Sequence, residues 1–91
     1  MDLQELREKI DEIDNGLISL FQQRMDIAAD IAMYKKQNNM AVYDPVRERE
    51  ILEKIANKVK GGREPSITAL YSLLFELSRA EQEKILNPEV V

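Results

Sequence analysis

The chain has 91 residues with a formal net charge of −4, and it contains neither histidine nor cysteine. The missing side chains exclude disulfides, the common zinc and haem ligands, and catalysis by Ser-His or Cys-His pairs. The negative charge disfavours nucleic-acid binding, which depends on neutralising phosphates. No apolar run has the length of a membrane span, and the N-terminus has no signal-peptide core. We therefore expect one cytoplasmic domain over residues 1–91 that holds no metal.

The first predicted element is a long helix over about residues 2–37. Asp2, with Glu5 three residues later, is typical of a capping-box start. Positions spaced alternately three and four apart from Leu3 to Ile31 are then apolar with one exception, which is Arg24. This is the pattern of one face of a helix or of a heptad seam. No proline interrupts the stretch, and two asparagines that follow it indicate its end.

The predicted length of this helix exceeds what one small domain can cover. About 35 residues, each rising about 1.5 Å, give a helix of roughly 50 Å, whereas a compact chain of this size is roughly 30 Å across. The apolar stripe continues along the helix, so we predict that a second copy of the chain covers it in an intertwined homodimer. The alternative is a monomeric bundle in which the first helix frays.

Two more helices follow, and no strand pattern occurs. The second is predicted over about residues 45–60, where Asp44 provides the N-cap, Pro45 is the first helical residue and a Gly-Gly pair ends the helix. The third is predicted over about residues 66–86, opened by a Pro-Ser pair. The sequence therefore predicts an all-α fold in which each protomer has a long, a short and a medium helix.

Several polar side chains occupy or flank slots that the apolar pattern assigns to the core. They lie on all three predicted helices and are Arg24, Lys35, Arg47, Glu48, Ser78 and Gln82. Singly, each has an ordinary explanation: a snorkelling cation, a buried ion pair between Glu48 and Arg24, or a solvated surface residue. Together they would impose a steep desolvation cost on a small core. Their excess of positive charge is typical of a pocket for a small dianion.

Arg7 flanks the same stripe near the start of the first helix. It lies 17 residues before Arg24, roughly 25 Å along a straight helix, so the two side chains of one chain cannot bind one small ligand. Taken alone, Arg7 could be a solvated charge. In an antiparallel dimer, however, Arg7 of one protomer can approach the pocket of its partner, which would make each site composite.

One series of residues runs through all three predicted helices. It consists of Leu6-Arg7-Glu8-Lys9-Ile10-Asp11, Arg24, Lys35, the block Asp44-Pro45-Val46-Arg47-Glu48-Arg49-Glu50, and finally Ser78 and Gln82. Over nearly the whole chain, this series resembles the all-helical (AroQ-class, type II) chorismate mutases. The resemblance implies an intertwined dimer that converts chorismate to prephenate by a Claisen rearrangement, without a cofactor. Because this module often occurs fused to prephenate dehydratase or another enzyme of the pathway, the chain could be one part of such a fusion.

The resemblance also implies roles at the reacting atoms. Lys35 and Gln82 would hydrogen-bond the ether oxygen of the breaking C–O bond, where negative charge develops. Glu48, with the backbone near Asp44, would take the ring hydroxyl. A unimolecular rearrangement needs no acid, base or nucleophile, which suits a chain without histidine or cysteine.

The remaining implied roles concern the two carboxylates of the substrate. Arg24 and Arg7 of the partner subunit would hold them. Arg47 and Ser78 would help to frame them. The predicted partners are thus a small dianion and a second copy of this chain, with neither nucleic acid nor membrane.

Two other functions share parts of this pattern. An isochorismate pyruvate lyase has the same fold and a similarly charged pocket, and the identity of the product separates it from a mutase. A non-catalytic helical dimerisation or effector-sensing module is the second alternative. In such a module, Leu or Met could replace the polar stripe residues without loss of stability. The intact set of Lys35, Glu48 and Gln82 favours an enzyme.

Overall fold

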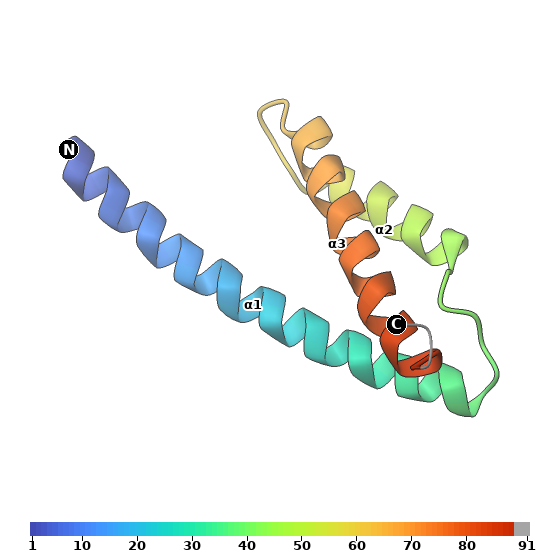
Figure 1. Ribbon diagram of the computed structural model, residues 1–91. Helices are drawn as coiled ribbons and strands as arrows, with labels where there is room; N and C mark the ends of the chain where they lie inside the picture. Colours follow the sequence, from blue (N-terminus) through green and yellow to red (C-terminus); the bar gives the residue numbers. More distant parts are fainter. Residues whose placement is uncertain (89–91) are drawn as a thin grey trace.

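The computed structural model describes residues 1–88, which form three helices (Figure 1). Helix α1 spans Leu3–Gln37, α2 spans Pro45–Ala56 and α3 spans Glu64–Leu86. The all-α prediction is confirmed for this part of the chain. The last three residues of the predicted domain, 89–91, lie outside the described residues. Among the helices described, none has the length and apolar character needed to cross a membrane.

Local signals in the sequence account for both ends of α1. At its start, Asp2 Oδ1 accepts a hydrogen bond from the Glu5 backbone N–H at 2.9 Å. At its end, the side-chain amide of Asn38 donates to the Tyr34 carbonyl at 2.8 Å. The next residue, Asn39, has a φ of 54°, in the left-handed region that asparagine tolerates better than most residues. Capping at both ends therefore fixes a helix of 35 residues.

The predicted end of the second helix, at about residue 60, is wrong, because α2 ends at Ala56. The side chain of Asn57 donates to the Glu53 carbonyl at 3.1 Å. This bond satisfies a carbonyl of the last turn, so the helix stops before the glycine pair. Gly61 and Gly62 have φ values of 69° and 73°, which other residues rarely adopt. They shape the loop to α3 and do not cap α2.

Helix α3 joins the other two helices. It begins at Glu64, two residues before the predicted start. Pro65 fits within the first turn, because a backbone N–H would have no helical partner there and proline therefore loses no hydrogen bond. It packs against both α1 and α2, whereas the backbones of α1 and α2 stay apart. The small core contains Ala28 and Ala32 of α1, Ile55 of α2 and Phe75 of α3. Alanines at the α1 contact let the α3 backbone approach closely.

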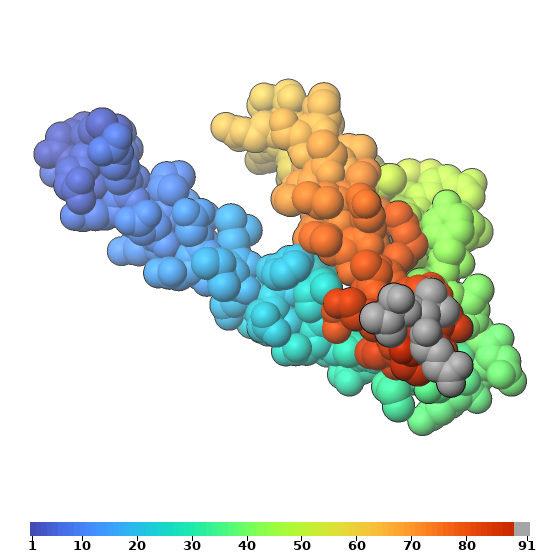
Figure 2. All heavy atoms as spheres, in the orientation of Figure 1, coloured from blue at the N-terminus to red at the C-terminus, as the bar shows by residue number. Residues whose placement is uncertain are grey.

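The N-terminal half of α1 projects beyond the other helices (Figures 1 and 2). It gives the molecule an elongated shape, with extents of 54 × 25 × 19 Å. The apolar stripe along this half is uncovered, and its side chains are 47–63 % exposed. They are Leu3, Leu6, Ile10, Ile13, Leu17 and Leu20. The stripe stays open in the C-terminal half of α1 as well, where Ile27 and Ile31 are 57 % and 44 % exposed, so one protomer leaves most of the stripe uncovered.

Candidate active site

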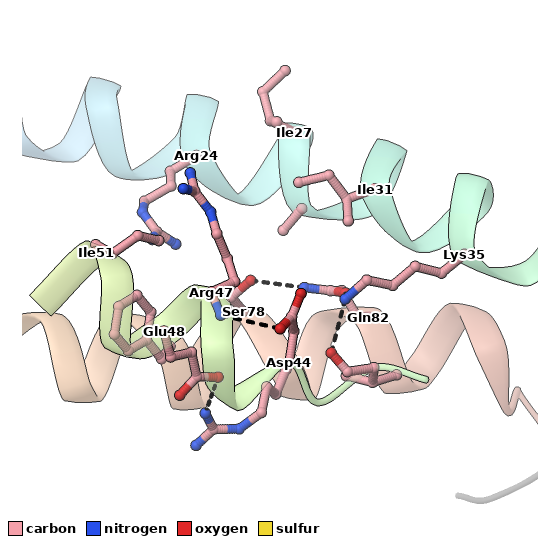
Figure 3. A pocket seen from close by; sticks show the side chains of 14 residues that line it. Arg24, Ile27, Ile31, Lys35, Asp44, Arg47, Glu48, Ile51, Ser78 and Gln82 are labelled. Carbon is pink, nitrogen blue, oxygen red and sulfur yellow. Dashed lines mark hydrogen bonds and ion pairs between the residues drawn. The ribbon is translucent and has the colours of Figure 1, made fainter. Parts of the chain in front are cut away.

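A cavity of about 500 Å³ lies between the C-terminal half of α1, the first turns of α2 and the C-terminal half of α3 (Figure 3). Seven of the eight residues predicted for the site line this cavity, although they come from three helices and a loop. The lining residues are Arg24, Ile27, Ala28, Ile31, Lys35, Val42, Asp44, Arg47, Glu48, Ile51, Phe75, Ser78, Arg79 and Gln82. Apolar walls thus surround a convergent set of polar groups, as in most small-molecule sites.

Positive charge predominates in the cavity. Four cationic side chains and two carboxylates line it, although the whole chain carries a net charge of −4. One carboxylate, Glu48, is paired with Arg79, and the other, Asp44, caps α2 by accepting the Arg47 backbone N–H at 3.0 Å. Arg24 and Arg47 form no ion pair within residues 1–88. These unpaired guanidiniums favour an anionic ligand.

Lys35 and Gln82 are buried at one end of the cavity, 9 % and 6 % exposed. Lys35 Nζ donates to Gln82 Oε1 at 2.9 Å and to the Val42 carbonyl at 2.8 Å. Because an ammonium can only donate, the Gln82 amide must turn its oxygen towards Lys35. Its Nε2 then donates to Ser78 Oγ at 3.1 Å (Figure 3). The network therefore fixes the orientation of the amide.

The same network leaves two donors free. An ammonium has three N–H donors and a primary amide has two. Within residues 1–88, Lys35 uses two of its three and Gln82 uses one of its two. One donor remains on each of two neighbouring side chains that other bonds already hold in place. Such preorganised donors stabilise negative charge on an oxygen with little reorganisation.

Aromatic rings of α3 hold Arg24. Its guanidinium carbon lies 5.9 Å from the ring centroids of both Tyr71 and Phe75. The two rings themselves pack edge to face, with centroids 6.1 Å apart. This contact orients the guanidinium but leaves its charge unneutralised. The ion pair between Arg24 and Glu48, considered as an alternative from the sequence, is not formed.

Arg79 is a cavity residue that the sequence analysis missed. Its Nη1 lies 2.5 Å from Glu48 Oε2, and its guanidinium carbon lies 5.4 Å from the ring centroid of Tyr43. The hydrogen bond to Glu48 raises the pKa of Arg79 above its ordinary value. The sequence does contain a signal for this residue. Arg79 follows Phe75 by four and precedes Gln82 by three, a spacing that places all three on one face of a helix.

Arg7 is the predicted site residue that does not line the cavity. It is exposed on the projecting half of α1. Because 17 residues of continuous helix separate it from Arg24, the two lie about 25 Å apart along the axis. The cavity of a single protomer therefore receives no charge from its own Arg7.

Comparisons with known proteins agree on one family. The sequence model described as "Chorismate mutase type II" matches residues 6–83. The chain is 35 % identical to the chorismate mutase of Methanocaldococcus jannaschii, over 93 % of this chain and 88 % of that protein. It is 35 % identical to the bifunctional chorismate mutase/prephenate dehydratase of Buchnera aphidicola subsp. Schizaphis graminum, over 94 % of this chain and 23 % of that protein.

A second bifunctional relative is likewise much longer than the segment that matches this chain. The bifunctional chorismate mutase/prephenate dehydratase of Escherichia coli K12 is 33 % identical, over 90 % of this chain and 22 % of that protein. The chain thus spans less than a quarter of the two bifunctional relatives but most of the Methanocaldococcus jannaschii protein. No solved structure gives a significant match. With the family match covering 6–83 and an all-helical fold around a cationic cavity, the chain belongs to the type II chorismate mutase family.

Proposed function

We propose that this protein is a chorismate mutase that converts chorismate to prephenate in the biosynthesis of phenylalanine and tyrosine. In this reaction the ether C–O bond breaks while a new C–C bond forms within the same molecule. No electrons or protons are exchanged with the enzyme. Catalysis then depends on holding the compact conformer of the substrate and on stabilising the charge that develops as the C–O bond breaks.

The observation that carries this proposal is the pair of free donors on Lys35 and Gln82. As the C–O bond breaks, negative charge grows on the ether oxygen, and two fixed donors interact more strongly with that oxygen in the transition state than in the ground state. Lys35 adds a full positive charge to its hydrogen bond. Burial of both side chains strengthens this interaction, because little water screens it.

The unpaired cations of the cavity match the two carboxylates of chorismate. Arg24, oriented by its aromatic contacts, binds one carboxylate through its planar guanidinium. Arg47 and the Ser78 hydroxyl help to frame the carboxylates from α2 and α3. Arg7 of the partner subunit supplies the remaining cation. Within one protomer, the excess of two positive charges among the lining side chains balances the two negative charges of this substrate.

Glu48 is the acceptor for the ring hydroxyl of the substrate. Its Oε2 is bonded to Arg79, and its Oε1 has no hydrogen-bond partner within the described residues. The free oxygen can therefore accept the hydroxyl proton in a hydrogen bond. The backbone near Asp44, at the start of α2, provides a second contact on this side.

The test is a continuous assay of chorismate disappearance with purified protein and no added cofactor. Mass spectrometry and acid conversion to phenylpyruvate identify the product as prephenate. A parallel reaction with isochorismate, monitored for salicylate and pyruvate, tests the lyase alternative. Prephenate formation supports the proposal. Salicylate and pyruvate without prephenate, or a folded protein that turns over neither compound, would refute it.

We also propose that the active form is an intertwined homodimer with composite sites. The uncovered stripe on α1 supports this assembly, because six adjacent large apolar side chains at 47–63 % exposure form a surface that soluble monomers rarely retain. A second copy that lies antiparallel along the stripe would bury it. The same arrangement carries Arg7 of the partner subunit towards the cavity, which its own Arg7 cannot reach.

A complementation experiment tests the composite site directly. Arg7→Ala and Arg24→Ala proteins should each be nearly inactive, because every site loses one carboxylate contact. When the two are unfolded, mixed in equal amounts and refolded, half of the dimers are mixed and each has one intact site. Activity should then recover to about a quarter of the parent level. Absence of recovery, or a monomeric parent in sedimentation, would contradict the composite dimer.

A further inference from the structure

Both members of the ion pair between Arg79 and Glu48 line the cavity. The pair joins α3 to the first turn of α2 with a distance of 2.5 Å between Nη1 and Oε2. Both side chains keep some contact with solvent, at 34 % exposure for Arg79 and 22 % for Glu48. The ion pair is therefore partly buried.

Arg79 is itself held from a second side. Its guanidinium carbon lies 5.4 Å from the ring centroid of Tyr43, in the loop between α1 and α2. A cation above an aromatic face is attracted by the ring quadrupole. Tyr43 and Glu48 thus engage the guanidinium together, which leaves Arg79 poorly placed to bind a substrate carboxylate directly. Its charge acts on Glu48.

The surroundings of Glu48 show why the position of its carboxylate matters. Glu48 lines the same cavity as Arg24 and Arg47, two guanidiniums without ion pairs in the described part of the chain. A flexible carboxylate in that cavity would be attracted to them. It would then occupy the cations that a dianionic substrate needs. The ion pair with Arg79, on α3, holds the Glu48 carboxylate away from these two guanidiniums.

We propose that Arg79 is a positioning residue that holds the Glu48 carboxylate at one wall of the cavity. The guanidiniums of Arg24 and Arg47 then stay free for the carboxylates of the substrate. The same contact aims the second oxygen of Glu48 at the ring hydroxyl. This inference rests on the proposed function, since it concerns how the same site keeps its cations available.

Steady-state kinetics with chorismate test the inference by comparing Arg79→Met with a double variant that also removes the Glu48 charge. Arg79→Met, which keeps the apolar stem but loses the charge, should raise KM about tenfold, equivalent to about 1.4 kcal/mol, with a smaller effect on kcat. The double variant Arg79→Met/Glu48→Gln should have a lower KM than Arg79→Met alone, because the competing carboxylate is gone. A purely structural role of Arg79 would not produce this recovery.

Three further variants complete the design. Arg79→Lys retains a cation for Glu48 and should stay within about threefold of the parent KM. Tyr43→Phe keeps the ring face and should behave like the parent. Arg49→Met makes the same substitution at an exposed position of α2 and is the matched control. An unchanged KM in Arg79→Met, or a KM in the double variant at least as high as in Arg79→Met, would overturn the inference.

A structural readout separates this inference from the proposed function. Ligand-free crystal structures of the parent and of Arg79→Met are compared at the Glu48 side chain. We expect the carboxylate to leave the α3 wall in the variant and to approach Arg24 or Arg47. An unmoved carboxylate would refute the positioning role even in an active enzyme. Conversely, a parent without mutase activity would refute the proposed function, while a displaced carboxylate would still support the positioning role.

Discussion

Replacing Gln82 by glutamate tests the donor pair most directly. Gln82 is 6 % exposed, accepts from Lys35 at 2.9 Å and donates to Ser78 at 3.1 Å, and a glutamate of nearly the same shape fits these contacts. An amide donates at any pH, whereas a carboxyl group donates only when it is protonated. The activity of Gln82→Glu should therefore fall as pH rises, while the activity of the parent stays flat across neutrality.

The size of this effect follows from the pKa of the introduced carboxyl group. Burial raises that pKa, and the Lys35 ammonium lowers it. At the ordinary glutamic acid pKa of about 4.3, the protonated fraction falls about 80-fold between about pH 5 and pH 7. A higher pKa moves the decline to higher pH without changing its direction or its limiting slope of about tenfold per pH unit.

The assay is the initial rate of chorismate disappearance for parent and variant between about pH 5 and pH 8, with circular dichroism at each pH to confirm folding. Gln82→Met is the matched control, because its side chain cannot donate and its rate should be low at every pH. A flat profile in Gln82→Glu would refute the contact between Gln82 and the ether oxygen. So would a Gln82→Glu rate at the acid end no higher than that of Gln82→Met.

Three other substitutions have defined outcomes. Lys35→Met should lower kcat by about 10²–10³, the usual effect of losing one such donor, with unchanged circular dichroism; a kcat near the parent value would exclude the role. Arg24→Lys should lower kcat/KM about tenfold, because an ammonium lacks the planar fork; parent-like kinetics would contradict the carboxylate contact. Within one protomer, a Cβ at Gly16 would meet nothing within 4 Å, so Gly16→Ala should stabilise the helix by about 0.5–1 kcal/mol, and a lower Tm in thermal unfolding would contradict this.

Much of the secondary structure was predictable because its signals are local. The first helix ends at residue 37 as predicted, since a run without proline followed by two asparagines determines that boundary within a few residues. The predicted end of the second helix at the glycine pair is wrong, because α2 ends at Ala56 and Asn57 is its C-cap. The side chain of Asn57 competes for a carbonyl of its own helix and ends it earlier. Such competition depends on side-chain conformation, which spacing alone does not reveal.

The composition of the cavity was also largely predictable. Polar residues in apolar slots on three helices carry a steep desolvation cost if each is buried alone. They are therefore expected to line one common cavity. Seven predicted residues do line one cavity. Periodicity, however, gives the face on which a residue lies and not its partner. Arg79 lies on the same helix face as Gln82, but spacing does not reveal that its guanidinium pairs with Glu48 of another helix.

By itself, the sequence determined the three helices, the N-caps Asp2 and Asp44 of the first two, the apolar stripe and the set of polar side chains that share its face. These properties depend on contacts within a few residues along the chain. The tertiary structure alone decided that Glu48 pairs with Arg79 and not Arg24, and that Lys35 and Gln82 each keep one donor free of any partner in residues 1–88. Hydrogen-bond partners from different helices depend on how those helices cross, and the crossing of α3 over α1 and α2 results from packing between segments far apart in the sequence.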